Sequence, residues 1–234
     1  MMRIRTGLAA AVIAAAVTML AGCADLEPAS EPAPSGEPSA APYTDPAAAW
    51  LADGSAAALV TWGSSSTACT PVAAEVQASA QTVTVTLAGP PADTACTADF
   101  APRATYVALP KHVDPTKDVI LSFAGDGFQG RVPLSGNSAL TGKSVPGKPS
   151  AGWFADGGIV LLTWGSSSCR PVVQGVTEAK DGATVTFQTV TDQVCTMDVV
   201  PRLTLIGVKA SAGTTGYTLH LVGDNLDGST TVIG

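Results

Sequence analysis

The sequence predicts an all-β protein: two tandem homologous units of six strands, each a β-sandwich or barrel-like unit, behind a signal peptide and a disordered stalk. Three observations lead to this prediction. Thr, Val, Gly and Ala dominate the part after residue 46, and no segment shows sustained helical periodicity. Short stretches such as 82–87 alternate apolar and polar residues, as a half-buried strand does. The same motifs also occur twice in the same order.

The N-terminus has the features of a signal peptide. Arg3 and Arg5 supply positive charge, and the apolar run 8–20 follows them. This run of roughly 13 residues is too short to span a bilayer, which needs about 20. It ends at Leu20-Ala21-Gly22-Cys23, which resembles the lipobox of bacterial lipoproteins. The resemblance implies cleavage before Cys23 and a diacylglycerol thioether on its sulfur, so that the membrane is one partner.

The next segment is rich in Pro, Ala, Ser and Glu and has few large apolar side chains, which is typical of a disordered or extended stalk. A second Gly-, Ser- and Pro-rich stretch separates the two copies of the repeat. The predicted organisation is a signal peptide at 1–22, a lipidated cysteine and stalk at 23–46, a first repeat at 47–134, a linker at 135–152 and a second repeat at 153–234.

The internal repeat is the main feature of the sequence. Its matching segments keep their order at a nearly constant offset, which indicates duplication. The matches are Trp50–Gly54 with Trp153–Gly157, Thr61–Ser66 with Thr163–Ser168, Cys69–Val72 with Cys169–Val172, Cys96–Thr105 with Cys195–Thr204, and Gly125-Asp126 with Gly223-Asp224.

Each copy is expected to contain six short strands, and Gly125-Asp126-Gly127 and Lys180-Asp181-Gly182 have the chemistry of hairpin turns. The strands are expected near 56–62, 71–78, 82–88, 103–109, 118–124 and 128–134, and near 158–164, 172–178, 183–189, 202–208, 216–222 and 229–233.

Cysteine usage favours an oxidising compartment. Of five cysteines, four remain once Cys23 carries lipid. Four cysteines allow three pairings, but each copy has one cysteine after its Trp-Gly-Ser loop and one before Asp-x-x-Pro-Arg. A bridge inside each copy is therefore predicted, namely Cys69–Cys96 and Cys169–Cys195.

The Trp-Gly-Ser-Ser-Ser…Cys and Cys-Thr-x-Asp-x-x-Pro-Arg patterns are similar to repeats of uncharacterised actinobacterial exported lipoproteins. The resemblance covers nearly all of both copies. It implies a location at the extracytoplasmic face of the bacterial cell membrane and brings no activity with it.

The serine loops suggest a hydrolase, but a nucleophilic serine needs a base within reach and an oxyanion hole. The only histidines, His112 and His220, do not occupy matching positions in the two copies, and no Gly-x-Ser-x-Gly elbow is present. Structural loops are therefore favoured, and no catalytic residue is assigned.

Two acid–base pairs recur four residues apart, Asp99 with Arg103 and Asp198 with Arg202. Structural ion pairs, or caps on loop amides, are the expected roles.

Trp62 and Trp164 are expected to pack in the core beside the disulfides, and Trp50 and Trp153 to seal an edge of each unit. The segment 224–228 contains two acids but lacks the pattern of a calcium loop, so a hairpin turn is predicted. No metal ligands and no cofactor are assigned.

Charge and composition limit the function. The net charge is −7 and no basic cluster occurs, so nucleic acid is not an expected partner. We expect a non-catalytic binding or structural module of the cell envelope with an unknown envelope or extracellular ligand. The alternative is a hydrolase-like envelope enzyme with its site between the two repeats.

Overall fold

The computed structural model describes residues 45–234, which belong to one compact unit spanning 42–234. The predicted signal peptide, the lipidation of Cys23 and the stalk up to residue 44 lie outside the described residues. Within residues 45–234, no helix has the length and apolar character needed to cross a membrane.

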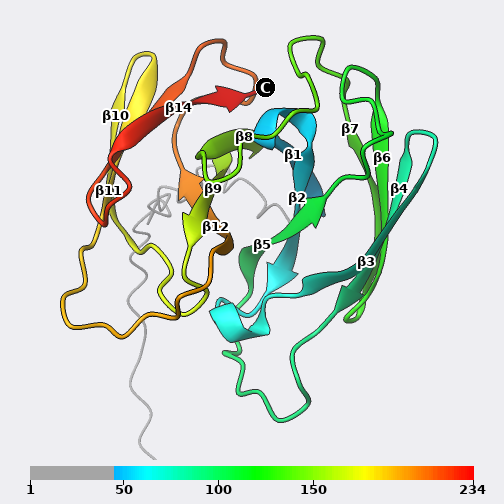
Figure 1. Ribbon diagram of the computed structural model, residues 1–234. Helices are drawn as coiled ribbons and strands as arrows, with labels where there is room; N and C mark the ends of the chain where they lie inside the picture. Colours follow the sequence, from blue (N-terminus) through cyan, green and yellow to red (C-terminus); the bar gives the residue numbers. More distant parts are fainter. Residues whose placement is uncertain (1–44) are drawn as a thin grey trace, which may run out of the picture. The chain divides into compact units, whose positions relative to one another are not determined.

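The described chain is built from strands joined by short turns (Figure 1). The strands of the first repeat are β1 (Ala47–Leu51), β2 (Ala56–Gly63), β3 (Val72–Ser79), β4 (Thr82–Ala88), β5 (Ala101–Ala108), β6 (Val119–Gly125) and β7 (Phe128–Leu134). Those of the second are β8 (Ser150–Ala155), β9 (Gly158–Gly165), β10 (Val173–Ala179), β11 (Gly182–Phe187), β12 (Val200–Gly207), β13 (Thr218–Val222) and β14 (Gly228–Ile233). Two short 3-10 helices, η1 (Ala52–Gly54) and η2 (Thr67–Cys69), complete the described elements.

Both repeats pair their strands in the same way. In the first repeat, β1-β2-β5 form one sheet and β3-β4-β6-β7 form another, with β4 and β6 parallel and all other neighbours antiparallel. In the second repeat, β8-β9-β12 and β10-β11-β13-β14 correspond to these two sheets. Here, however, β14 also pairs in parallel with β8, which joins them into one seven-stranded sheet.

Each repeat encloses a core between its three-stranded and four-stranded parts. In the first repeat this core contains Leu59 of β2, Val85 of β4 and Leu121 of β6. In the second it contains Leu161 of β9 and Leu219 of β13. These side chains are fully buried. In β4 and β13, the alternation of apolar and polar residues predicts this burial.

A third core joins the two repeats. The other faces of β2 and β9 are also apolar, and Val60 and Leu162 on these faces are fully buried in a cluster shared by both repeats. The order of layers is therefore β3-β4-β6-β7, β1-β2-β5, β8-β9-β12 and β10-β11-β13-β14, and Figure 1 shows the two three-stranded parts lying between the outer ones. With its own three cores, the unit 42–234 can be expected to fold without the preceding residues.

The all-β class is confirmed, but the prediction of two six-strand sandwich or barrel-like units was wrong. Each repeat has seven strands, and the repeats stack face to face in a solenoid-like succession of sheets with a shared core. The sequence pattern does not show how the two repeats pack, and the strands that join them are β2 and β9. Both are buried on both faces, which is why they are apolar almost throughout.

All twelve expected strands are present within residues 45–234, with ends that differ by at most two residues. The turn between β6 and β7 consists of Asp126 and Gly127, both with positive φ (52° and 76°), as a two-residue hairpin of type I′ requires. The strands not predicted are β1 and β8. Alanine and glycine, which have low β-propensity, make up much of both.

The segment predicted as a linker packs against the first repeat. The Gly142 amide donates to the Asp53 carbonyl oxygen at 2.8 Å, and the side chain of Leu140 is 6% exposed in the first core. The end of the predicted linker, from Ser150 onward, already forms β8.

Candidate functional site

The serine loop of the first repeat forms a closed hydrogen-bond cluster. The Ser65 amide donates to Asp99 Oδ1 at 3.0 Å, and the Thr97 hydroxyl donates to the same oxygen. The hydroxyls of Ser64 and Thr97 lie 2.7 Å apart. The carboxylate therefore caps the loop that follows β2.

The second repeat reproduces this cluster. The Ser167 amide donates to Asp198 Oδ1 at 3.1 Å, the Thr196 hydroxyl donates to the same oxygen, and Ser166 Oγ lies 2.7 Å from Thr196 Oγ1. A contact that stabilises each repeat is expected to occur in both copies, as this cluster does.

Neither cluster contains a suitable base. Hydrogen bonds from the Ser65 side chain, the Thr97 side chain and the Ser65 amide lower the pKa of Asp99 to about 2, and those from Thr196 and Ser167 do the same to the pKa of Asp198. A carboxylate with so low a pKa is a weak base at neutral pH. His112, at 3.4 Å from the Ala78 carbonyl oxygen, belongs to a different loop, and His220 lies on β13. Within residues 45–234, neither serine loop therefore has a histidine beside its hydroxyl groups.

The predicted ion pairs Asp99–Arg103 and Asp198–Arg202 were wrong, since neither pair forms a salt bridge in residues 45–234. Four residues of extended chain span about 13 Å, so the acid in the loop and the arginine in the strand point to different partners. The alternative role, in which the acid caps loop amides, is the one that the geometry shows.

Each of the two arginines instead donates a hydrogen bond to the backbone of a disulfide-bonded cysteine. Arg103 is 8% exposed, donates to the Cys69 carbonyl oxygen at 2.6 Å, and lies 4.0 Å from Asp126. Arg202 is 9% exposed and donates to the carbonyl oxygens of Cys169 and Trp164 at 2.7 and 3.1 Å.

Both disulfides form within their own repeat, in the pairing that the repeat favours. The Cα atoms are 5.8 Å apart in Cys69–Cys96 and 5.5 Å apart in Cys169–Cys195. Each closes a loop with a sequence separation of 27 or 26 residues. The chain-entropy relation gives about 3.5 kcal/mol of stabilisation for a loop of that length.

The positions of the tryptophans differ from the prediction, which placed Trp62 and Trp164 rather than Trp50 and Trp153 in the cores. Trp50 and Trp153 are buried in the two repeat cores, at 5% and 7% exposure. Trp62 is half-buried and stacks on Phe100, a residue that is itself 64% exposed. Trp164 is also half-buried and packs edge-on against Tyr106 of the other repeat. The strand register places Trp62 and Trp164 on the same face as the shared core, which explains the exchange.

The turn at 223–228 shows no arrangement for calcium. The Gly223 amide donates to Asp227 Oδ1 at 3.2 Å, and the Leu226 amide donates to the Gly223 carbonyl oxygen at 3.0 Å. Across the described part of the chain, no group of three or more His, Cys, Asp or Glu side chains could hold a metal ion.

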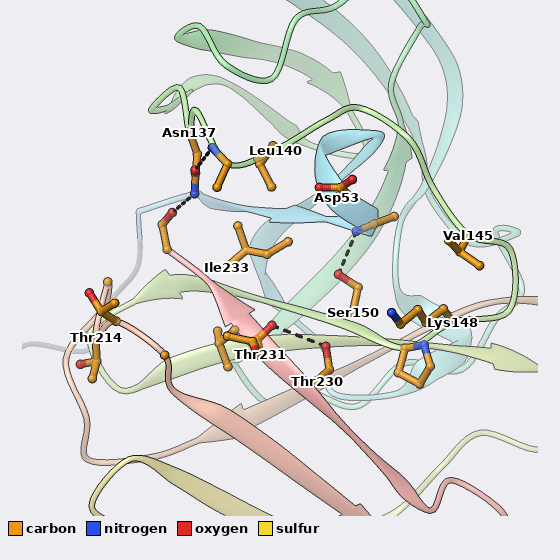
Figure 2. Close-up of a pocket in the computed structure, with 18 of the residues that line it drawn as sticks. Asp53, Asn137, Leu140, Val145, Lys148, Ser150, Thr214, Thr230, Thr231 and Ile233 are labelled. Carbon is orange, nitrogen blue, oxygen red and sulfur yellow. Dashed lines mark hydrogen bonds between the residues drawn. The ribbon is translucent and has the colours of Figure 1, made fainter.

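A hollow of about 590 Å³ lies between the segment 137–149, the start of β8, β14 and the turn 213–216 (Figure 2). Its lining includes the buried apolar residues Leu140 and Val232. Hydroxyl groups line much of the rest, supplied by Ser150, Thr214, Thr215, Thr230 and Thr231, and Asp53, Lys143 and Lys148 add charges of both signs.

Short contacts hold the walls of this hollow. Ser150 Oγ accepts a hydrogen bond from the Ala52 amide at 2.9 Å, and the Asn137 side-chain amide donates to the Gly234 carbonyl oxygen at 2.8 Å (Figure 2). Sequence reasoning did not find this site. Its residues come from the predicted linker and from turns, and no motif marks them.

Two smaller hollows lie elsewhere. One of about 400 Å³ is lined by Trp50 and Trp153, and one of about 300 Å³ lies beside the Cys169–Cys195 bridge. No known protein family matches this chain, and neither a curated protein nor a solved structure shows significant similarity to it.

Proposed function

We propose that this chain is a lipid-anchored binding protein at the extracytoplasmic face of the cell membrane, which holds an uncharged, hydroxyl-rich envelope ligand without transforming it. The observation that carries the proposal is the hollow of about 590 Å³, whose volume falls in the usual range for ligand sites. Its threonine and serine hydroxyls both donate and accept hydrogen bonds, which suits the hydroxyl groups of a glycan.

The proposal that the bound ligand is not transformed is supported by the chemistry of the serine loops. Their only carboxylates, Asp99 and Asp198, have a pKa of about 2 and are engaged by loop hydroxyls and amides. The location rests on two disulfides, which persist in oxidising compartments, and on the sequence pattern at Cys23.

Binding can be tested on residues 42–234 with soluble cell-wall glycan fragments, by calorimetry and by NMR. Shifts are expected at Thr214, Thr230 and Thr231. Thr215→Trp, which places a large side chain at the exposed edge of the hollow, should abolish binding and leave the melting temperature unchanged. Thr177→Trp, on the exposed face of β10, is the matched control and should bind normally.

Two results would overturn this part of the proposal. One is binding that persists in Thr215→Trp. The other is recovery of shortened glycan after incubation, abolished by Ser65→Ala with Ser167→Ala, which would favour the hydrolase alternative.

The anchor is tested in cells that carry the full chain. Cys23→Ala should release the protein into the medium or leave an unprocessed precursor, since the acceptor sulfur is gone. A mutant that remains in the membrane fraction with a cleaved N-terminus would contradict the lipid anchor.

A further inference from the structure

The hollow beside the second disulfide has unusual chemistry for its size. About 300 Å³ in volume, it lies between the end of β9, the loop 188–195 and the turn after β13. The Cys169–Cys195 bridge forms part of its wall together with Leu226 and Val190, which are apolar. The remaining lining includes the side chains of Arg202, Arg170, Asp224 and Asn225.

Arg202 is the buried cation of this hollow. Two of its N–H groups donate to the carbonyl oxygens of Cys169 and Trp164, but its Nε has no hydrogen-bond partner. The residue is 9% exposed, so this N–H is also largely withheld from bulk solvent. A buried donor without a partner is destabilising, and a ligand that accepts from it would offset that cost.

The charges of the hollow do not balance. Arg202 forms no salt bridge within residues 45–234, and Arg170, which is exposed, adds a second guanidinium. Asp224 supplies one carboxylate, so two positive charges face one negative charge. Burial and the nearby Arg170 both lower the pKa of Arg202, while Asp224 raises it. A bound anion would offset the mutual repulsion of the two arginines.

The first repeat lacks this arrangement at the corresponding positions. Thr70 stands where the second repeat has Arg170, so one cation is missing. Phe128 stands where the second repeat has Leu226, and the guanidinium carbon of Arg103 lies 5.4 Å from the centre of its ring. Arg103 also has Asp126 at 4.0 Å. The two copies therefore share the buried arginine and its unpartnered Nε, but they differ in what covers and neutralises it.

We infer that the hollow between Arg202, Arg170 and the Cys169–Cys195 bridge binds the carboxylate of a small organic monoanion. Guanidinium groups bind carboxylates through paired N–H donors. Arg170 presents an exposed guanidinium to the hollow, and the buried Nε of Arg202 adds an N–H without a partner. The net charge of plus one, counting Asp224, matches one negative charge better than the two of a phosphate. Leu226 and Val190 give the organic part an apolar wall. The site is independent of the glycan hollow proposed above.

The inference can be tested on residues 42–234 with benzoate as the probe. Benzamide is its uncharged analogue of nearly the same shape, and inorganic phosphate is the competing anion. Benzoate should bind at least tenfold more tightly than benzamide, weaken as salt is added, and shift the NMR resonance of the Arg202 Hε. Equal binding of benzoate and benzamide, or tighter binding of phosphate than of benzoate, would overturn the assignment.

Variants identify the residues. Arg170→Thr introduces the residue that the first repeat has at this position. It should weaken benzoate binding at least tenfold without lowering the melting temperature. Arg170→Lys should keep part of the affinity. Leu226→Phe should block the hollow as Phe128 covers Arg103. Arg131→Thr removes an exposed arginine from β7 and is the matched control. If Arg170→Thr and Leu226→Phe bind benzoate as the wild type does, the inference is wrong.

Discussion

Asp99 and Asp198 lie in irregular loops, yet each accepts a hydrogen bond from the loop amide at the same position of its repeat. A capping contact of this kind depends on the local loop and strand geometry, so duplication copies it with the sequence. The arginines four residues later were copied too, but their surroundings diverged. Arg103 faces Asp126 and Phe128, whereas Arg202 faces an open hollow.

The caps should be visible in the acid dependence of stability. The pKa of each carboxyl is about 2 in the folded protein and about 3.9 in an unfolded chain. A lowered folded pKa contributes stability above the unfolded value, and this is lost as pH falls from about 4 to about 2. Asp99→Asn with Asp198→Asn should therefore lower stability at pH 7 and reduce its decline between these pH values.

Denaturant unfolding at several pH values measures this effect, and NMR of the carboxyl carbons gives the two pKa values directly. Asp93→Asn, which removes a carboxylate from an exposed loop, controls for the general change in charge. Carboxyl resonances of Asp99 and Asp198 that titrate near pH 4 would contradict the capping role.

At the scale of elements, the sequence predicts strands well where apolar and polar side chains alternate. It does not predict strands that consist mainly of small residues. The strand β4, with alternating Thr and Val, was predicted to its last residue. By contrast β1 is Ala47–Leu51, mostly alanine, and was missed. A strand of small residues forms where it lets two sheets approach closely. At Gly152 of β8, an added Cβ would lie 2.1 Å from the Trp50 carbonyl oxygen.

The hollows could not be predicted for a related reason. The hollow of about 590 Å³ combines the segment 137–149, η1, the start of β8 and the end of β14, which are far apart in the sequence. No periodicity or motif indicates which turn will lie over which strand. For the hollow beside the second disulfide, the repeat predicted the Cys169–Cys195 bridge in its wall. It did not indicate that Arg170 and Arg202 line the same hollow.

The strands β1 and β8 each place a tryptophan in a core, Trp50 and Trp153, and these two residues can be compared directly. Trp50 Nε1 donates to the Ser135 carbonyl oxygen at 2.8 Å, whereas Trp153 Nε1 is buried without a partner. Phenylalanine removes the N–H from either position. Trp50→Phe should cost about 1 kcal/mol more in the free energy of unfolding than Trp153→Phe, because only the first loses a hydrogen bond. Equal costs in denaturant unfolding would mean that the Trp50 bond adds no stability.

For the described unit as a whole, the decisive feature is the core shared by the two repeats. Leu161 and Leu162 are neighbours on β9 and both are fully buried, but Leu161 faces the core of the second repeat and Leu162 faces the shared core. If each repeat were an independent unit, the face that bears Leu162 would be exposed to water. Its burial against residues of the first repeat, such as Val60, couples the stabilities of the two.

This coupling can be measured with the two leucines. Either Leu→Ala change should cost about 2–5 kcal/mol, as removal of buried methyl groups from a packed core does. Because the repeats share a core, Leu162→Ala should lower a single unfolding transition and speed amide exchange in β4 and β11 alike. Leu161→Ala is the matched control within one repeat. It should affect β11 at least as strongly as β4, because β11 borders the same core. Two separate transitions, with exchange in β4 unchanged in Leu162→Ala, would show that the repeats fold independently and that the shared core adds little to their stability.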